Sequence, residues 1–179
     1  ESESRGLGDV YKRQTIKYLY EDDDIVVINK SINLLSTPGK IVDDSVYSRL
    51  KDYYQDQIEP MLVHRLDMST SGILICAKNK ESYQFLQRAF LKKTVFKRYV
   101  ALLDGIVHGD NGEIDLPLLL DWENRPNQKV CYKEGKKALT KWTLISKTKS
   151  TSRVYFYPIT GRTHQLRVHA AHTLSLIHI

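Results

Sequence analysis

Hydrophobic and polar residues follow two different periods along this chain. Short apolar runs and strict alternation predict β-strands, which we expect at residues 25–28, 72–77, 99–103, 139–145 and 153–159. Apolar positions three, four and seven residues apart predict helices, which we expect at residues 45–54, 80–92 and 164–171. Because strands and helices do not alternate regularly, we predict an α+β fold with a mixed, largely antiparallel central sheet and flanking helices.

Polar residues stand where each predicted helix begins and can cap it. Asp44 or Ser45 precedes the first helix, Asn79 the second, and Thr163 the third. Side-chain oxygens at such positions accept hydrogen bonds from the free N–H groups of the first turn. The apolar face of the second helix is expected to comprise Tyr83, Leu86, Ala89 and Phe90. Between the predicted strands, residues 121–137 are polar and rich in turn formers.

Composition adds a positive charge to this picture. The formal net charge is +6, which suits a polyanionic partner. The chain has 179 residues, enough for one domain with a substantial core. Cys76 and Cys131 match no metal-binding spacing or disulfide framework, which fits a reducing compartment. No apolar run approaches membrane-spanning length and no signal peptide is visible. We therefore expect a cytoplasmic protein that does not contact a membrane.

The two ends of the chain differ from the rest. Residues 1–14 show no clear period and resemble a translated sequencing-adapter tail, and residues 173–179 resemble the same adapter read in the other direction. We predict non-native tails at 1–14 and 173–179 and one domain at 15–172 that is incomplete on its C-terminal side. The alternative at each end is a divergent natural terminus.

Two motifs combine residue types that can carry chemistry. The sequence HRLDMSTSG at residues 64–72 places Asp67 after an apolar run, and TGRTHQ at 160–165 places Arg162 in a glycine turn. A nucleophilic carboxylate must stay ionised when it is shielded from water, and a nearby guanidinium favours its charged form. Spacing alone does not show that these residues meet. Taken singly, Asp67 also fits a residue that caps a turn, and Arg162 a surface residue.

Together with two further motifs, these sequences resemble the RluA-type pseudouridine synthases, in the family's order. The four matching blocks are YEDD with VINK at 20–30, HRLDMSTSG with AK at 64–78, KRYVA at 97–101, and PITGRTHQLRVH at 158–169. The sequences DWENRP at 121–126 and QKVCY at 128–132 resemble the small branch that modifies both large-subunit rRNA and tRNA. Where the family usually has Gly this chain has Asn33, a residue type that tolerates positive φ.

The resemblance implies a fold, a reaction and a partner. Residues 15–172 would form a pseudouridine synthase catalytic domain with a cleft across its sheet. It would be an isomerase that converts uridine to pseudouridine in structured RNA, either large-subunit rRNA or a tRNA anticodon stem-loop. The resemblance implies no cofactor and no metal, since the isomerisation involves no redox change, and we expect the protein to act as a monomer.

Three residues are expected to be catalytic by the same resemblance. Asp67 would attack the target uridine, Arg162 would pair with Asp67, and Tyr99 would lie against the uracil and help to remove the C5 proton. The sequence does not distinguish attack at the base, attack at the sugar, or initial removal of a sugar proton. Spacing alone would place Tyr99 in the core as an ordinary strand residue.

Other residues are expected to bind RNA. Arg65 precedes the nucleophile, and its planar guanidinium could stack in the space that a flipped base leaves. The remaining candidates for RNA contact are His64, Lys97, Arg125, Lys129 and His164. His64 could instead hold the catalytic loop. His164 and His169 are five positions apart and turn to different faces of a helix, so we predict no metal site.

Two other functions remain open at this point. One is an RNA-binding module that keeps a basic cleft without the chemistry. The other is an RNA phosphodiesterase that uses His64 and His164 as acid and base, which would cleave the strand. The joint presence of Asp67, Tyr99 and Arg162 favours the isomerase, because binding alone needs no nucleophile.

Overall fold

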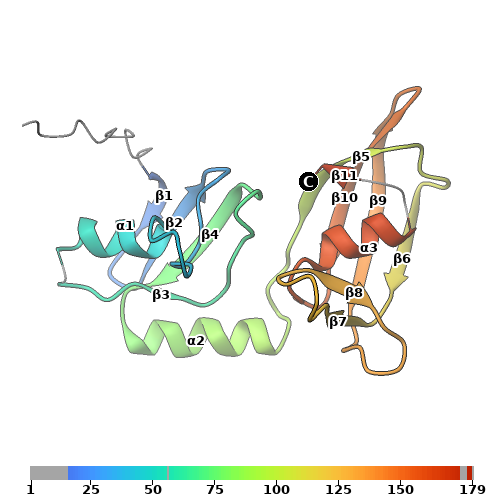
Figure 1. The fold of residues 1–179 in the computed structure, drawn as a ribbon. Coiled ribbons are helices and arrows are strands. Elements are labelled where there is room, and N and C mark those ends of the chain that lie inside the picture. The colour runs from blue at the N-terminus through green and yellow to red at the C-terminus, as the bar shows by residue number, and fades with distance from the viewer. Residues whose placement is uncertain (1–15, 56, 174–176, 179) are drawn as a thin grey trace, which may run out of the picture. The chain divides into compact units, whose positions relative to one another are not determined.

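The computed structural model describes residues 16–55, 57–173 and 177–178. The chain divides into two compact units, residues 1–84 and 85–179. Figure 1 colours the first unit from blue to green and the second from green to red. The tail predicted at residues 1–14 lies outside the described residues, as do four positions of the tail predicted at 173–179.

The first unit is built on a four-stranded antiparallel sheet of order β1-β2-β4-β3. Its strands are β1 (Lys17–Glu21), β2 (Ile25–Lys30), β3 (Met61–Leu62) and β4 (Gly72–Ala77). Alternation in β2 buries Val26, Ile28 and Lys30 on one face, because successive side chains of a strand point to opposite sides. The strand predicted at residues 72–77 is confirmed with the same bounds.

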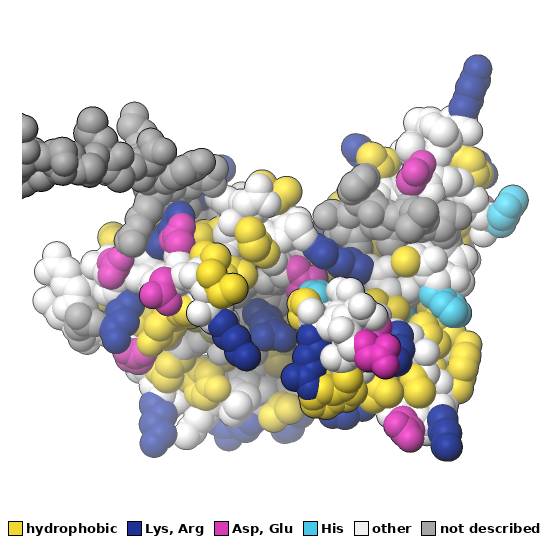
Figure 2. All heavy atoms as spheres, viewed as in Figure 1, with side chains coloured by type: hydrophobic (Ala, Val, Ile, Leu, Met, Phe, Trp, Pro, Cys, Tyr) yellow, Lys and Arg dark blue, Asp and Glu magenta, His cyan; other side chains and the backbone are white. Residues whose placement is uncertain are grey.

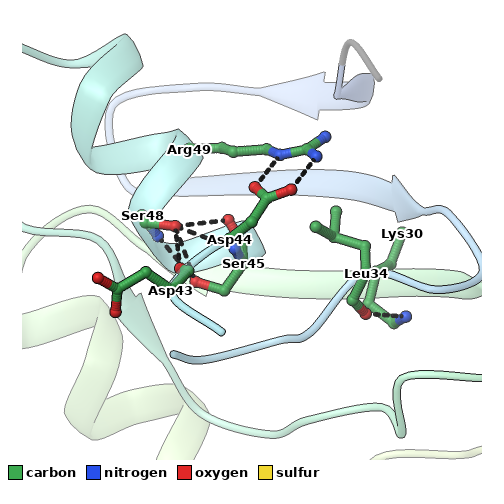
Figure 3. Close-up of polar contacts among 7 residues, drawn as sticks. All are labelled: Lys30, Leu34, Asp43, Asp44, Ser45, Ser48 and Arg49. Carbon is green, nitrogen blue, oxygen red and sulfur yellow. Dashed lines mark hydrogen bonds and ion pairs between the residues drawn. The ribbon is translucent and has the colours of Figure 1, made fainter. Parts of the chain in front are cut away.

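Capping decides where the first two helices begin. Helix α1 (Val46–Tyr53) is capped by Ser45, whose side chain accepts from Ser48 N–H while the Ser48 hydroxyl accepts from Ser45 N–H. Asp44, the alternative cap, instead accepts two hydrogen bonds of 2.6 and 2.7 Å from Arg49 (Figure 3). Helix α2 (Lys80–Leu91) is capped as predicted by Asn79, whose Oδ1 accepts from Ser82 N–H. The half-buried residues of α2 include the whole predicted apolar face.

The second unit contains a five-stranded antiparallel sheet of order β11-β5-β10-β9-β6. Its strands are β5 (Tyr99–Asp104), β6 (Asn111–Asp115), β9 (Leu139–Lys147), β10 (Thr151–Pro158) and β11 (Ile177–His178). One face packs into a core with Ala170 and Leu166 of helix α3 (Gln165–Thr173). Largest among the buried side chains of this core are Leu103, Ile114, Trp142 and Phe156.

Helix α3 begins one residue later than predicted. His164 has a φ of 52°, in the left-handed region, so the helix starts at Gln165. Val168 N–H donates to the His164 carbonyl as the first turn closes. The helix continues two residues beyond the predicted end at 171.

A two-stranded ribbon begins just before the segment 121–137 that was predicted to be polar and turn-rich, and its second strand lies within that segment. β7 (Leu118–Leu120) pairs antiparallel with β8 (Gln128–Val130), and Lys136 bridges the other side of Leu118. Neither strand was predicted from the sequence, and nor were β1, β3, β6 or β11, the last of which lies in the tail predicted at 173–179. Every strand pair named here is antiparallel, so the predicted α+β class and the predominance of antiparallel pairing are confirmed.

Gly135 closes the turn that follows β8. A Cβ at this position would overlap the Cys131 carbonyl oxygen and lie 2.8 Å from the Pro117 carbonyl carbon, both of which are backbone atoms. We expect Gly135→Ala to lower the free energy of unfolding by about 1–3 kcal/mol, because backbone must move to relieve the overlap. Urea unfolding measures this. Gly161→Ala is the control, since nothing lies within 4 Å of its added Cβ, and an equal loss in both variants would contradict the steric explanation.

Candidate active site

Asp67 lies in the loop between β3 and β4 of the first unit, and the residue before it is fixed from both sides. The Ser36 hydroxyl donates to the Leu66 carbonyl at 2.8 Å and accepts from Leu66 N–H at 3.0 Å. Ser36 and Leu66 are both buried. Because one side chain satisfies both backbone groups of Leu66, the backbone entering Asp67 has a defined direction.

The residues after Asp67 form a tight turn. Thr70 N–H donates to the Asp67 carbonyl at 3.0 Å, and Asn33 N–H donates to the Met68 carbonyl at 2.8 Å. Asn33 has a φ of 63°, so the expected tolerance of Asn for this conformation is used here. The loop carrying Asn33 and the loop carrying Asp67 are therefore joined backbone to backbone.

Lys30 also connects these two loops, through its side chain. The sequence motifs did not identify it as a site residue. Its side chain is 1% exposed, and its Nζ donates to the carbonyls of Leu34 at 2.6 Å, Ser31 at 2.9 Å and Met68 at 3.3 Å. Figure 3 shows the contact with Leu34. Burial lowers the pKa of Lys30 to about 8, and the negative charge of Asp67 opposes that shift. The Lys30 cation thus binds the backbone of the Asp67 loop, and its charge is attracted by the Asp67 carboxylate.

His64 and Arg65 precede Asp67 in the same loop. His64 Nε2 accepts a hydrogen bond of 3.1 Å from Ile75 N–H, which ties the loop to β4. An accepting Nε2 requires a neutral ring at that nitrogen. His64 therefore ties the Asp67 loop to β4, and its predicted RNA contact stays a prediction. Arg65 is exposed.

Tyr99 and Arg162 lie in the second unit, at the same end of its sheet. Tyr99 begins β5 and is the register partner of Phe156, while Arg162 follows the end of β10. Because β5 and β10 are antiparallel, the start of β5 lies beside the end of β10, at the same end of the sheet. Tyr99 is half-buried, and the exposed Arg162 donates from Nε to the Lys137 carbonyl at 3.1 Å.

A buried network sets the backbone around Arg162. Gln165, 3% exposed, accepts at Oε1 from Arg162 N–H at 3.0 Å and from the Thr160 hydroxyl at 2.7 Å. Its Nε2 donates to the Leu139 carbonyl and to Thr140 Oγ1. One side chain therefore fixes the Thr160–Arg162 turn to the start of β9. The sequence placed Gln165 in the motif but gave it no role.

His169 extends this network into the core. Its Nδ1 lies 3.0 Å from Thr140 Oγ1 and its Nε2 lies 3.0 Å from the Leu116 carbonyl. A carbonyl accepts only, so Nε2 carries the proton and Nδ1 accepts from the threonine hydroxyl. Burial lowers the pKa of His169, while the hydrogen bond to Leu116 and the charge of Asp115 oppose the shift.

This buried histidine makes stability depend on pH in the acid range. The unfolded state binds a proton near the ordinary His pKa of 6.5 and the folded state binds it only at lower pH. Below about pH 6.5 the unfolded state therefore holds more protons, and stability falls as pH falls. We expect the wild type to lose more unfolding free energy between pH 7 and pH 5 than His169→Gln, in urea titrations. Exposed His108→Gln is the control, and parallel curves for wild type and His169→Gln would contradict the linkage.

The remaining predicted RNA contacts are distributed over the second unit. Lys97 is half-buried, and burial followed by the charge of Lys93 lowers its pKa. Arg125 lies over the Trp122 ring, and Lys129 pairs with Asp121 at 3.3 Å. His164 occupies the left-handed residue before α3. Figure 2 shows Lys and Arg side chains on the viewed face of each unit.

Neither a metal-binding cluster nor a membrane-spanning helix occurs among the residues that the structure describes. Within the described ranges, no group of three or more His, Cys, Asp or Glu side chains is arranged to hold a metal ion. No helix in the part of the chain that the structure describes is long and apolar enough to cross a membrane.

The fold and these motifs together define a class of protein. The antiparallel sheets and helices match two solved human structures, RNA pseudouridylate synthase domain containing 1 and RNA pseudouridylate synthase domain containing 4. Their TM-scores are 0.75 and 0.71, and each is 27% identical to this chain. The first alignment covers 89% of this chain and 66% of that structure, and the second 87% and 64%. Residues 24–172 match the RNA pseudouridylate synthase family, and the chain belongs to it.

The curated relatives of this chain described here are both RluA enzymes. The dual-specificity RNA pseudouridine synthase RluA of Vibrio cholerae is 45% identical over 156 residues, which are 86% of this chain and 62% of that protein. The RluA of Escherichia coli K12 is 46% identical over 155 residues, covering 84% of this chain and 69% of that protein. The chain thus spans less than two thirds of the V. cholerae relative.

Proposed function

We propose that this chain carries the catalytic part of an RNA pseudouridine synthase of the RluA type. The observation that supports it most is the family match across residues 24–172, which includes an Asp67 whose loop is fixed by Ser36, Lys30 and Asn33. The relatives named above are dual-specificity enzymes. The proposed substrates are accordingly a uridine in large-subunit rRNA, in a tRNA anticodon stem-loop, or in both.

The proposed reaction conserves every atom of the nucleotide apart from exchange of protons. The bond from C1′ to N1 of uridine breaks, the uracil turns, and a bond from C1′ to C5 forms. The proton on C5 leaves to solvent and N1 gains a proton. No oxidation state changes and no group is transferred to or from another molecule, so the proposed reaction includes no cofactor.

Each candidate residue has a role that follows from its chemistry. The Asp67 carboxylate would form the transient bond to the uridine, and the Arg162 guanidinium would stabilise its charge. Tyr99 would stack on the uracil and accept the C5 proton. Arg65, exposed beside Asp67, would occupy the space left by the flipped base. Lys97, Arg125, Lys129 and His164 would bind phosphates, which position RNA without reading its sequence.

Tritium release tests this function directly. RNA carrying C5-tritiated uridine releases tritium when C5 loses its proton. We expect release from a large-subunit rRNA hairpin or a tRNA anticodon stem-loop, with the RNA strand left intact. Strand cleavage would indicate a phosphodiesterase. Binding without release, persisting in a version extended to the length of the V. cholerae relative, would identify an RNA-binding module.

A further inference from the structure

Trp122 is a large apolar side chain that the fold leaves in solvent. It is 66% exposed, whereas the other tryptophan of the chain, Trp142, is 6% exposed in the core. The guanidinium carbon of Arg125 lies 3.4 Å from the centroid of the Trp122 ring. The two side chains form a stacked pair, called here the Trp122–Arg125 pair, on the loop that connects β7 to β8.

Hydrogen bonds hold this loop in one shape. Asp121 N–H donates to the Asn127 carbonyl and Asn127 N–H donates to the Asn124 carbonyl, each at 2.9 Å. The Asp121 carboxylate accepts from Asn124 Nδ2 at 3.0 Å and from Lys129 Nζ at 3.3 Å. The loop is therefore closed by its own polar groups and does not bury Trp122 to gain its shape.

The segment that carries the pair has a net positive charge. Residues 121–137 contain five basic and three acidic side chains. Asp121 and Lys129 pair with each other at 3.3 Å, so the segment keeps four basic side chains against two acidic ones. A surface that combines an open aromatic face with several cations suits a ligand that has both a planar ring and a negative charge.

We propose that the Trp122–Arg125 pair is a stacking site for one unpaired nucleotide of the RNA substrate. The base stacks on the indole, and Arg125 contacts a neighbouring phosphate. Every base has a π-face, so such a site accepts any unpaired nucleotide, whereas bases inside a duplex are covered by their neighbours. This site rests on the proposed function for the identity of the RNA, and it adds a contact to an unpaired base apart from the target uridine.

Tryptophan fluorescence gives a direct test with hexauridylate as the probe. Stacking on Trp122 should quench wild-type emission in a saturable manner. Trp122→Phe, which leaves Trp142 as the remaining tryptophan, should bind without quenching. Trp122→Ala should bind hexauridylate about 5- to 150-fold more weakly, the range for loss of one base–aromatic stack of about 1–3 kcal/mol.

Two controls distinguish base stacking from charge attraction and from nonspecific binding to exposed aromatic side chains. An abasic ribose-phosphate hexamer has the charge without the rings, so it should not quench and its affinity should be the same for wild type and Trp122→Ala. Tyr132→Ala removes another exposed aromatic side chain, 75% exposed and two residues after β8, and should leave hexauridylate binding unchanged. Three results would each overturn the site. Trp122→Ala could lose as much affinity for the abasic hexamer as for hexauridylate, Tyr132→Ala could lose as much affinity for hexauridylate as Trp122→Ala, or Trp122→Ala could bind hexauridylate as tightly as the wild type.

The same preparations distinguish this inference from the proposed function. Tritium release by the wild type, with normal hexauridylate binding by Trp122→Ala, would refute the stacking site and keep the isomerase. Quenching lost on substitution of Trp122, without tritium release from either RNA by this chain or by the extended version, would refute the isomerase and keep the stacking site. Unfolding midpoints of the variants check that the exposed substitutions leave the fold intact.

Discussion

Asp67→Asn is expected to lower tritium release by at least about 1,000-fold while RNA affinity stays within about threefold. Asn has nearly the shape of Asp but carries no negative charge and cannot form the transient bond, and loss of a nucleophile removes most of a covalent mechanism. The loop itself should persist, because Ser36 and Lys30 hold it through backbone groups that the substitution leaves in place. Single-turnover tritium release and filter binding measure the two quantities.

Asp23→Asn is the matched control, since Asp23 is an exposed aspartate of the same unit. It should release tritium at the wild-type rate. Substantial release by Asp67→Asn would remove Asp67 from the mechanism. Loss of release together with loss of binding and of folding would show that Asp67 acts as a structural residue.

Lys30→Met is expected to lower the free energy of unfolding by about 2–3 kcal/mol. The substitution leaves the carbonyls of Ser31, Leu34 and Met68 without the charged donor that they share, and unmet buried acceptors are costly. Part of that loss is offset because methionine is buried without removing a charge from water. Urea unfolding gives the value, and exposed Lys17→Met on β1 should change it by less than about 0.5 kcal/mol.

The pH dependence of this difference has a defined sign. Lys30 has a pKa of about 8 in the folded state and an ordinary value of 10.5, so the unfolded state binds more protons between these values. The contribution of Lys30 to stability therefore rises with pH in that window, and this contribution is absent from Lys30→Met. The advantage of the wild type over Lys30→Met should widen from pH 8 to pH 10. Parallel curves would show that Lys30 is not desolvated in the folded protein.

Local signals in the sequence were sufficient for elements whose pattern is complete within a few residues. The strand at 72–77 is continuous and apolar, and the helix after Asn79 has both a cap and a coherent apolar face, so their positions could be read without a partner. β1 is largely exposed, and β7 and β8 are three residues each. Such strands exist because another strand supplies their hydrogen bonds, which no local pattern records.

The sequence by itself determined the family motifs and the residues proposed for chemistry, because a motif fixes residue type and order. It did not determine how those residues are held. Pairing of β2 with β4 buries Lys30 beneath the Asp67 loop, and pairing of β10 with β9 brings Gln165 and His169 to Thr140. Asp44, the other candidate cap of α1, instead pairs with Arg49 five positions along the chain, and Ser45 caps the helix. A buried polar side chain is stabilised by partners distant in sequence, so only the tertiary structure could identify its role.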